Sequence, residues 1–262
     1  MQVTSYAPGT PCWVDMGSPD IEGTKTFYTS LFGWTANEGG PETGGYVIFN
    51  QGDSPVAGAG PHMSEGQPTV WNSYFATDDA AATERKIESA GGKVLMNAMD
   101  VMDLGRMGLY TDSAGAVFGL WQAGTFIGAG MANEPNSLSW NELQVHDIDS
   151  AKEFYQKALG LSPQASDISG AEGYTEFQVA GRTVAGGMST DRPEFPPNLP
   201  PNWMVFFAVA DTDAIATNAA KLGAQVVVPP TDIAVGRFSV IIDPQGATFA
   251  VLTMSPDTPA PA

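Results

Sequence analysis

Two short segments combine an aromatic ring with a carboxylate on one face of a strand. Trp13 stands two residues before Asp15, and Trp140 stands two residues before Glu142. Side chains two apart in a strand lie on the same face, so each pair places an indole beside an acid. Such a pair can stack a flat ligand and can hold an ammonium group or accept a proton. Asp15 and Glu142 are therefore candidate catalytic residues.

Other reactive side chains are few. Cys12 has no neighbouring base, so we expect an inert thiol. His62 and His146 each follow a strand pattern, and we interpret them as loop or strand-end residues. Arg106 and Arg237 can anchor an anionic ligand group, but the many carboxylates of this chain favour local ion pairs.

Composition limits the partners. The 262 residues include 29 acidic and 11 basic ones, a net charge of −18, which excludes nucleic acid as a partner. Acidity keeps a protein soluble or, alternatively, draws a cationic ligand into a cleft. No apolar run reaches the roughly 18 residues of a membrane span. With no signal-peptide pattern and a single cysteine, we expect a cytoplasmic protein without membrane contact.

The two aromatic–acid segments belong to an internal repeat. Residues 20–28, which end in Phe27-Tyr28, recur 127 residues later as 147–155. The order is kept further along the chain, where Trp71 recurs as Trp203. Other recurring pairs are Val56-Ala57-Gly58 with Val184-Ala185-Gly186, Gly105-Arg106 with Gly236-Arg237, and 111–115 with 242–246. An ordered recurrence with small drift indicates a duplication.

The repeat predicts two domains, residues 8–122 and 136–254. The glycine-containing stretch 123–135 is expected to be a linker, and 255–262 a disordered tail. Within the first copy, a strand over 12–16 precedes a helix that Asp20 or nearby Ser18 caps and that runs to Phe32, where Gly33 ends it. A second round follows from residue 71. Each copy reads βαβββ twice, so we predict an α+β fold of four βαβββ units.

These features resemble the vicinal-oxygen-chelate superfamily, which includes glyoxalase I, bleomycin-resistance proteins and extradiol dioxygenases. The resemblance rests on the Asp…Phe-Tyr helix starts at 20 and 147, the helix ends at 91–92 and 223–224, and the Asp-x-x-Gly turns at 112–115 and 243–246. It implies two glyoxalase-like domains whose curved mixed sheets enclose cups. Each cup forms either from one copy or from units exchanged between copies; the sequence leaves both open.

The Trp-Val-Asp and Trp-Asn-Glu openings are most similar to a tandem two-domain actinobacterial subgroup. That subgroup includes a mycobacterial tandem-glyoxalase antigen and proteins named hydroxylases near genes for aromatic polyketide antibiotics. Since duplication supplies internally what single-domain relatives obtain by dimerising, we expect a monomer, with a homodimer as the alternative.

The resemblance also places the metal ligands of the superfamily. Catalytic members hold a divalent metal with His, Glu or Gln side chains. Here those positions fall on Trp13, Gly58, Asn72 and Gly119, and on Trp140, Gly186, Met204 and Ala250. Such side chains do not hold a hard cation, and one amide cannot do so alone. We therefore predict no metal and no other cofactor.

In place of metal ligands, the cups are expected to offer aromatic walls. The expected ligand-binding residues are Trp13, Asp15, Asn72, Tyr74, Trp140, Glu142, Met204 and Phe206, with Trp71 and Trp203 nearby. Gly58, Gly119, Gly186 and Ala250 are expected to let the ligand approach the strands.

The function favoured by these residues is metal-independent binding of a small aromatic or cationic metabolite or antibiotic, in a resistance or biosynthesis accessory role. One alternative is a metal-free tailoring enzyme for an aromatic polyketide, with Asp15 or Glu142 as the base. A metal-dependent glyoxalase-type lyase or dioxygenase is the other, and the mapped positions disfavour it.

Overall fold

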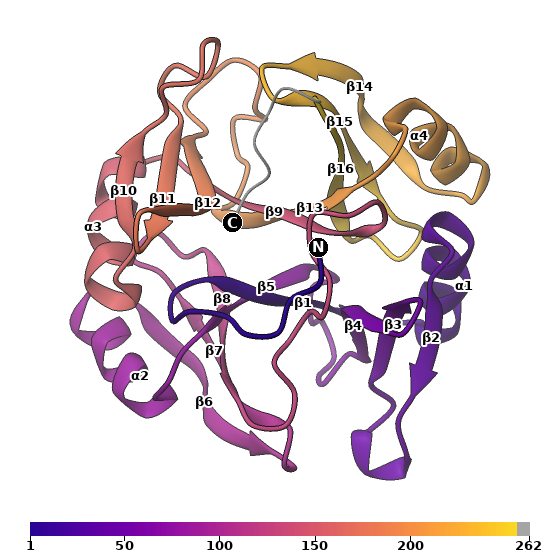
Figure 1. The fold of residues 1–262 in the computed structure, drawn as a ribbon, viewed down its shortest axis with the longest axis horizontal. Helices are drawn as coiled ribbons and strands as arrows, with labels where there is room; N and C mark the ends of the chain where they lie inside the picture. The colour runs from indigo at the N-terminus through magenta and orange to yellow at the C-terminus, as the bar shows by residue number, and fades with distance from the viewer. Residues whose placement is uncertain (256–262) are drawn as a thin grey trace.

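The computed structural model describes residues 1–255, and its elements form two copies of one series (Figure 1). The first copy contains β1 (Pro11–Ser18), α1 (Ile21–Phe32), β2 (Thr35–Glu38), β3 (Val47–Gln51), β4 (Ser54–Pro61), β5 (Trp71–Ala76), α2 (Ala80–Ser89), β6 (Lys93–Val101), β7 (Gly105–Thr111) and β8 (Val117–Ala123). The second copy contains β9 (Ser137–Val145), α3 (Ile148–Leu159), β10 (Ser162–Ala165), β11 (Thr175–Val179), β12 (Arg182–Ser189), β13 (Asn202–Ala208), α4 (Thr212–Lys221), β14 (Gln225–Ile233), β15 (Gly236–Ile242) and β16 (Thr248–Met254). The α+β fold of four βαβββ units is therefore confirmed. Of the predicted tail, only Ser255 lies within the described residues.

Each copy forms its own eight-stranded mixed sheet. The strand order is β2-β3-β4-β1-β5-β8-β7-β6 in the first sheet and β10-β11-β12-β9-β13-β16-β15-β14 in the second. The two units of the first copy join where β1 pairs antiparallel with β5, and β9 and β13 join the second copy in the same way. Each cup is thus built from one copy, which the sequence had left open.

The helices begin and end at the predicted signals. The Asp20 carboxylate caps α1 by accepting a hydrogen bond from the Gly23 N–H at 2.9 Å. Asp147 caps α3 in the same way. Gly33 ends α1 in the left-handed region, with φ 72°, which a residue without a Cβ adopts at little cost. The repeated Asp-to-Gly segments therefore define two equivalent helices.

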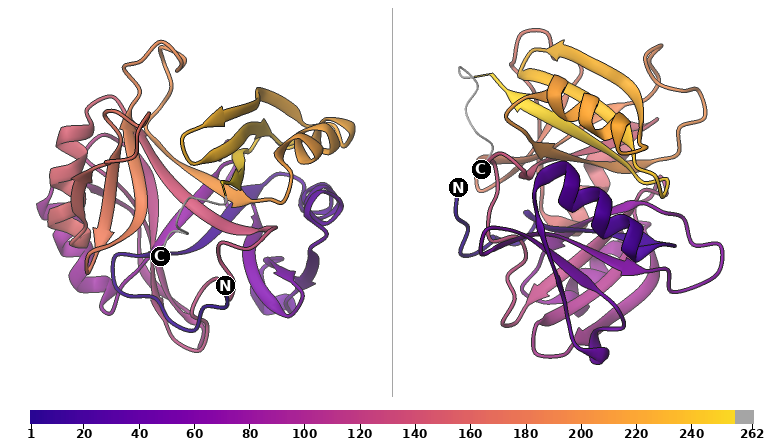
Figure 2. Two further views of the ribbon diagram at one scale, coloured as in Figure 1. Left: turned by 45° about the horizontal axis from the view of Figure 1, so that its top comes forward. Right: turned by 90° about the vertical axis from the view of Figure 1, so that its right-hand side faces the viewer.

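The convex faces of the two sheets pack against each other, so the concave faces point in opposite directions (Figures 1 and 2). One apolar cluster combines α1 and its strands with α4 and its strands, for example Phe27 with Phe249. The other combines the α2 and α3 sides, for example Phe118 with Phe154. Burial of this aromatic surface holds the copies together.

A polar chain crosses each of these clusters. The Trp71 indole N–H donates to the Tyr28 hydroxyl at 3.0 Å, and that hydroxyl donates to Asp243 of the other copy at 2.8 Å. The equivalent chain runs from Trp203 through Tyr155 to Asp112, with distances of 2.8 and 3.1 Å. The helix tyrosines of one copy therefore meet the turn aspartates of the other. Trp71 and Trp203 belong to the convex core, and our expectation that they lie near the cups is wrong.

None of the helices in the described part of the chain has the length and apolar character needed to cross a membrane.

Candidate functional site

The eight predicted site residues form two groups of four, one in each cup. In the first cup Asp15 of β1 lies opposite Asn72 of β5, and Trp13 lies opposite Tyr74. In the second cup Glu142 of β9 lies opposite Met204 of β13, and Trp140 lies opposite Phe206. Each group occupies the two central strands of its sheet, where the βαβββ units join.

Asp15 is held by three neutral donors. Its Oδ1 accepts a hydrogen bond from the Asn72 amide at 3.1 Å. Its Oδ2 accepts hydrogen bonds from the hydroxyls of Tyr46 and Tyr74, each at 3.1 Å. Burial raises the pKa of Asp15 to about 6, although these three hydrogen bonds oppose the rise. Asp15 therefore changes charge close to neutral pH, which suits either a general base or a switchable anion.

Tyr46 links the acid to the indole. The Trp13 N–H donates to the Tyr46 hydroxyl at 2.9 Å, and that hydroxyl donates to Asp15. Burial beside Asp15 raises the pKa of Tyr46 well above its ordinary value, so the phenol keeps its proton. The aromatic ring and the carboxylate of the sequence pattern thus belong to one hydrogen-bonded chain.

The second cup repeats this chain with other partners. The Trp140 N–H donates to the Tyr174 hydroxyl at 2.8 Å. Glu142 accepts a hydrogen bond from the Gln144 amide at 2.9 Å. Burial raises the pKa of Glu142, while Gln144, the Tyr174 hydroxyl and the charge of Arg192 lower it.

Tyr46 and Tyr174 were not predicted from the sequence. Each follows a glycine just before a strand, as Gly45-Tyr46 and Gly173-Tyr174. They are 128 residues apart, the same offset that relates Gly58 to Gly186. That shared offset was the signal in the sequence that could have paired Tyr46 with Gly58 and Tyr174 with Gly186.

The glycines of the cups make room for these tyrosines, not for a ligand. A Cβ on Gly58 would collide with the Tyr46 hydroxyl, and a Cβ on Gly186 would collide with that of Tyr174. A Cβ on Gly119 would collide with the Tyr74 ring. Our expectation that these glycines allow a ligand to approach is therefore wrong for all three.

The donor set of the first cup does not fit a divalent metal. Both oxygens of Asp15 accept hydrogen bonds from neutral donors, and the two phenols stay protonated. The remaining oxygen donor there is one amide, whereas Mg²⁺ and Ca²⁺ need several oxygen ligands. Within residues 1–255 no three His, Cys, Asp or Glu side chains are grouped as a metal site would require.

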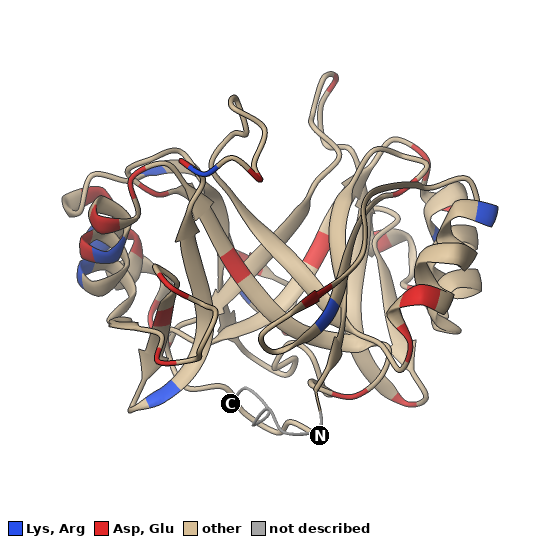
Figure 3. Ribbon diagram, turned by 90° about the horizontal axis from the view of Figure 1, so that it is seen from above, with Lys and Arg blue, Asp and Glu red and all other residues tan. Residues whose placement is uncertain are grey.

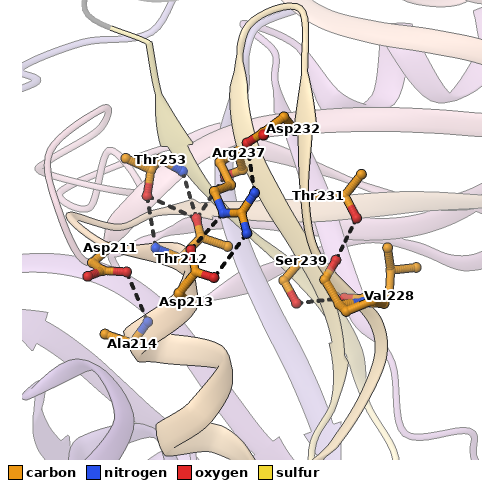
Figure 4. A network of polar contacts seen from close by, with 11 residues as sticks. Asp211, Thr212, Asp213, Ala214, Val228, Thr231, Asp232, Arg237, Ser239 and Thr253 are labelled. Atoms are coloured by element: carbon orange, nitrogen blue, oxygen red, sulfur yellow. Dashed lines mark hydrogen bonds and ion pairs between the residues drawn. The ribbon is translucent and has the colours of Figure 1, made fainter.

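The remaining reactive side chains have local partners. Arg237 forms ion pairs with Asp213 and Asp232 at the edge of the second sheet (Figure 4). Arg106 likewise pairs with Asp100 at 2.8 Å. His146 contacts Asp191 at 2.8 Å at the surface. Cys12 is buried, and burial raises the pKa of its thiol, which keeps it unreactive.

Two surface hollows lie beside the N-terminal segment, and the second touches Tyr6, Ala76 and Trp121 of the apolar cluster in the first cup. Their volumes are about 390 and 230 Å³, and none of the predicted site residues lines them. Inside each cup the space over the central glycine holds a tyrosine ring. A ligand there must contact the half-buried side chains of the wall or displace that tyrosine.

Comparisons with known proteins agree with the fold. The family described as "Glyoxalase/Bleomycin resistance protein/Dioxygenase superfamily" matches residues 13–120 and 137–251. CFP32 of Mycobacterium tuberculosis is 41% identical over 260 residues, covering 97% of this chain and 98% of its own. The "Anthracycline biosynthesis protein DnrV" of Streptomyces peucetius is 39% identical over 277 residues, covering 99% and 98%.

Solved structures show the same fold at low identity. The 2,3-dioxygenase LapB from Pseudomonas sp. KL28 has a TM-score of 0.65 at 12% identity, covering 98% of this chain and 97% of its own. The Mn(II)-bound glyoxalase from Novosphingobium aromaticivorans has a TM-score of 0.64 at 16% identity, covering 94% and 82%.

Proposed function

Because the chain belongs to the glyoxalase/bleomycin resistance protein/dioxygenase superfamily, we propose that it binds a small aromatic molecule in a cup without a metal ion. The observation that carries this proposal is the Trp–Tyr–carboxylate chain, which occupies the strands where metal ligands are expected by resemblance. Those strands offer an aromatic wall with a titratable acid. They offer no set of ligands for a hard cation.

The walls of the cups support an aromatic ligand. Phe206 and Leu252 belong to the second cup, together with half-buried Met204 and Phe238. An aromatic pair contributes about 0.5–1.5 kcal/mol beyond the burial of its area, and methionine adapts its shape to flat rings. The relative named for anthracycline biosynthesis supports a role in antibiotic biosynthesis.

A second candidate function is a metal-free enzyme that acts on an aromatic polyketide. The pKa of Asp15, about 6, favours it, because a general base works best when its pKa lies near the ambient pH. In this function Asp15 or Glu142 removes a proton from a substrate hydroxyl or an activated carbon. The same cup can therefore carry either function, and only turnover separates them.

A thermal-shift screen tests the binding function. Polycyclic phenols and quinones are added to the full chain, and the expected result is a rise in Tm that grows with ligand concentration by mass action. Asp15→Asn and Glu142→Gln are then compared with the wild type for product formation from each compound that binds. Binding without turnover supports the first function, and turnover lost in either variant supports the second. If no compound raises Tm, the proposed function is wrong.

A further inference from the structure

The two cups carry the same chain but differ around it. We infer that the second cup is the ligand site, and that its ligand is an aromatic molecule with a positively charged amine. This inference rests on the proposed function and gives it a place and a chemical class. It follows from the row of side chains across each sheet, the donors around each carboxylate, and what covers each indole.

The row through Glu142 contains a second acid. In register across β11, β12, β9 and β13 lie Glu176, Gly186, Glu142 and Met204. In the first cup the equivalent row is Ile48, Gly58, Asp15 and Asn72. The second cup therefore has two carboxylates separated by a glycine, where the first has an acid, an isoleucine and an amide.

Glu142 has fewer hydrogen-bond donors around it than Asp15 has. Both Asp15 oxygens accept hydrogen bonds, from three donors in all. Glu142 accepts hydrogen bonds from the Gln144 amide and the Tyr174 hydroxyl. Glu176 is paired on both oxygens, because it accepts from the Ser166 and Thr183 hydroxyls, each at 2.8 Å. An ammonium group brings three donors and a positive charge, which two neighbouring carboxylates favour.

Arg192, whose charge acts on Glu142, has partners outside the row. Arg192 lowers the pKa of Glu142 through its charge, but its guanidinium donates to the Glu172 carbonyl at 2.9 Å. It also lies 3.9 Å from Glu194. Lys and Arg are sparse throughout the protein (Figure 3).

A segment of the protein itself covers the indole of the first cup. Phe126, from the segment between the copies, packs edge-on against Trp13 with ring centroids 5.0 Å apart. Hydrogen bonds from Phe126 to Leu104 and from Ala129 to Cys12 hold that segment in place. Only 4% of Trp13 is exposed as a result. An aromatic ligand cannot reach this indole without moving the segment.

Among the described residues, the indole of the second cup is more open: Trp140 is half-buried, whereas Trp13 is buried. Met204 and Phe238 beside it are half-buried, as are Asn72 and Met107 in the first cup. The half-exposed Trp140 can therefore stack a ring, and its face attracts a nearby cation.

A buried hydroxyl in β9 gives independent support. Ser139 is 7% exposed, and its Oγ has no hydrogen-bond partner among the described residues. It precedes Trp140 as Cys12 precedes Trp13, and Cys12 belongs to the apolar cluster inside the first cup. Buried hydroxyls in proteins nearly always have a partner, so a polar group of the ligand fits here.

Calorimetric titration of the full chain tests this inference with three probes that share one ring: naphthylmethylamine, naphthylmethanol and naphthylacetate. We expect the amine to bind with one equivalent per chain and about tenfold more tightly than the alcohol, with the acid weakest. In Glu142→Gln, the affinity for the amine should fall about tenfold while that for the alcohol changes less than about twofold. Glu176→Gln should show a smaller loss of the same kind.

Glu172→Gln is the matched control, since it removes an exposed acid of the same copy outside the row and should leave both affinities unchanged. Melting curves establish that the variants are folded. Saturable binding with equal affinity for the amine and the alcohol would overturn the inference and leave the proposed function standing. So would binding of the amine that Glu142→Gln does not weaken. If none of the three probes binds saturably, the proposed function itself is contradicted.

Discussion

A hydrogen-bonded chain of tryptophan, tyrosine and carboxylate occurs on both faces of each sheet, in two different environments. On the convex face, Trp71 donates to Tyr28, which donates to Asp243 of the other copy. On the concave face, Trp13 donates to Tyr46, which donates to Asp15 of the same copy. The donor types and distances are similar, so chemistry alone does not separate the face that joins the copies from the face that forms the cup.

The chains on the two faces differ in their burial and in whether backbone N–H groups donate to the acid. On the convex face, Tyr28 is 0% and Asp243 is 3% exposed, and the second oxygen of Asp243 accepts backbone N–H groups of its own turn. Asp15 and Tyr46 are only half-buried, and side chains alone hold the acid. A fully buried, fully paired chain stabilises the fold, whereas a half-exposed one can exchange partners with a ligand.

The largest effect is expected from Tyr28→Phe on the convex face. It leaves the Asp243 carboxylate short of a donor and the Trp71 N–H without an acceptor, both inside the core. We expect a loss of about 3 kcal/mol in the free energy of unfolding, measured with urea. Tyr155→Phe should behave alike. A loss below about 1 kcal/mol would mean that this chain contributes little to joining the copies.

The next effect concerns pH and the concave acid. An unfolded Asp titrates near pH 4, but the pKa of Asp15 in the fold is about 6, so the native state binds the proton more tightly. Asp15 therefore costs stability as pH rises from about 4 to about 6, and the loss is complete above that range. Relative to Asp15→Asn, the wild type should lose about 2 kcal/mol over this range. A difference between the two proteins that does not vary with pH would contradict the burial of this acid.

Gly58→Ala tests whether position 58 needs a glycine to leave room for the Tyr46 side chain. The new Cβ would displace the Tyr46 hydroxyl from its place between Trp13 and Asp15. We expect a loss of about 1–2 kcal/mol. In a Tyr46→Ala background the same change should cost less than about 0.5 kcal/mol, because the space is then free. Equal costs in both backgrounds would show that Gly58 is needed for another reason.

The smallest effect is expected at the surface network of Arg237. Its side chain pairs with Asp213 of α4 and Asp232 of β14 (Figure 4), and about one third of it is exposed. Arg237→Gln should cost much less stability in urea unfolding than Tyr28→Phe, and the cost should shrink at high salt. A loss as large as that of Tyr28→Phe would contradict the view that burial sets the strength of these contacts.

Much of this arrangement could be predicted from the sequence. The repeat offset gave four βαβββ units, and the caps Asp20 and Gly33 set the ends of α1. Strand parity put Asn72 and Tyr74 on one face of β5, as it put Trp13 and Asp15 on one face of β1. The same parity puts Trp71 on the opposite face, so the expectation that it lines the cup overlooked a rule the sequence already contained.

Unlike Tyr74, Tyr46 and Tyr174 each stand just before a strand, where strand parity does not place their rings. Tyr46 precedes β3 in a loop, so no periodicity indicates which way its ring points. A glycine in a strand is compatible with a ligand or with another side chain above it, and only the position of Tyr46 decides between them. The pairing of units into cups also depends on the contact of β1 with β5, which local patterns do not encode.

Metal content tests most directly whether the concave acids are held by the protein's own phenols and amides. The full chain is purified without chelators, incubated in turn with manganese, iron, nickel and zinc salts, desalted and analysed by mass spectrometry for bound metal. The expected result is far less than one equivalent of any of these ions, unchanged in Asp15→Asn and Glu142→Gln. One tightly held ion per chain that either variant releases would contradict it and would make the cup a metal centre.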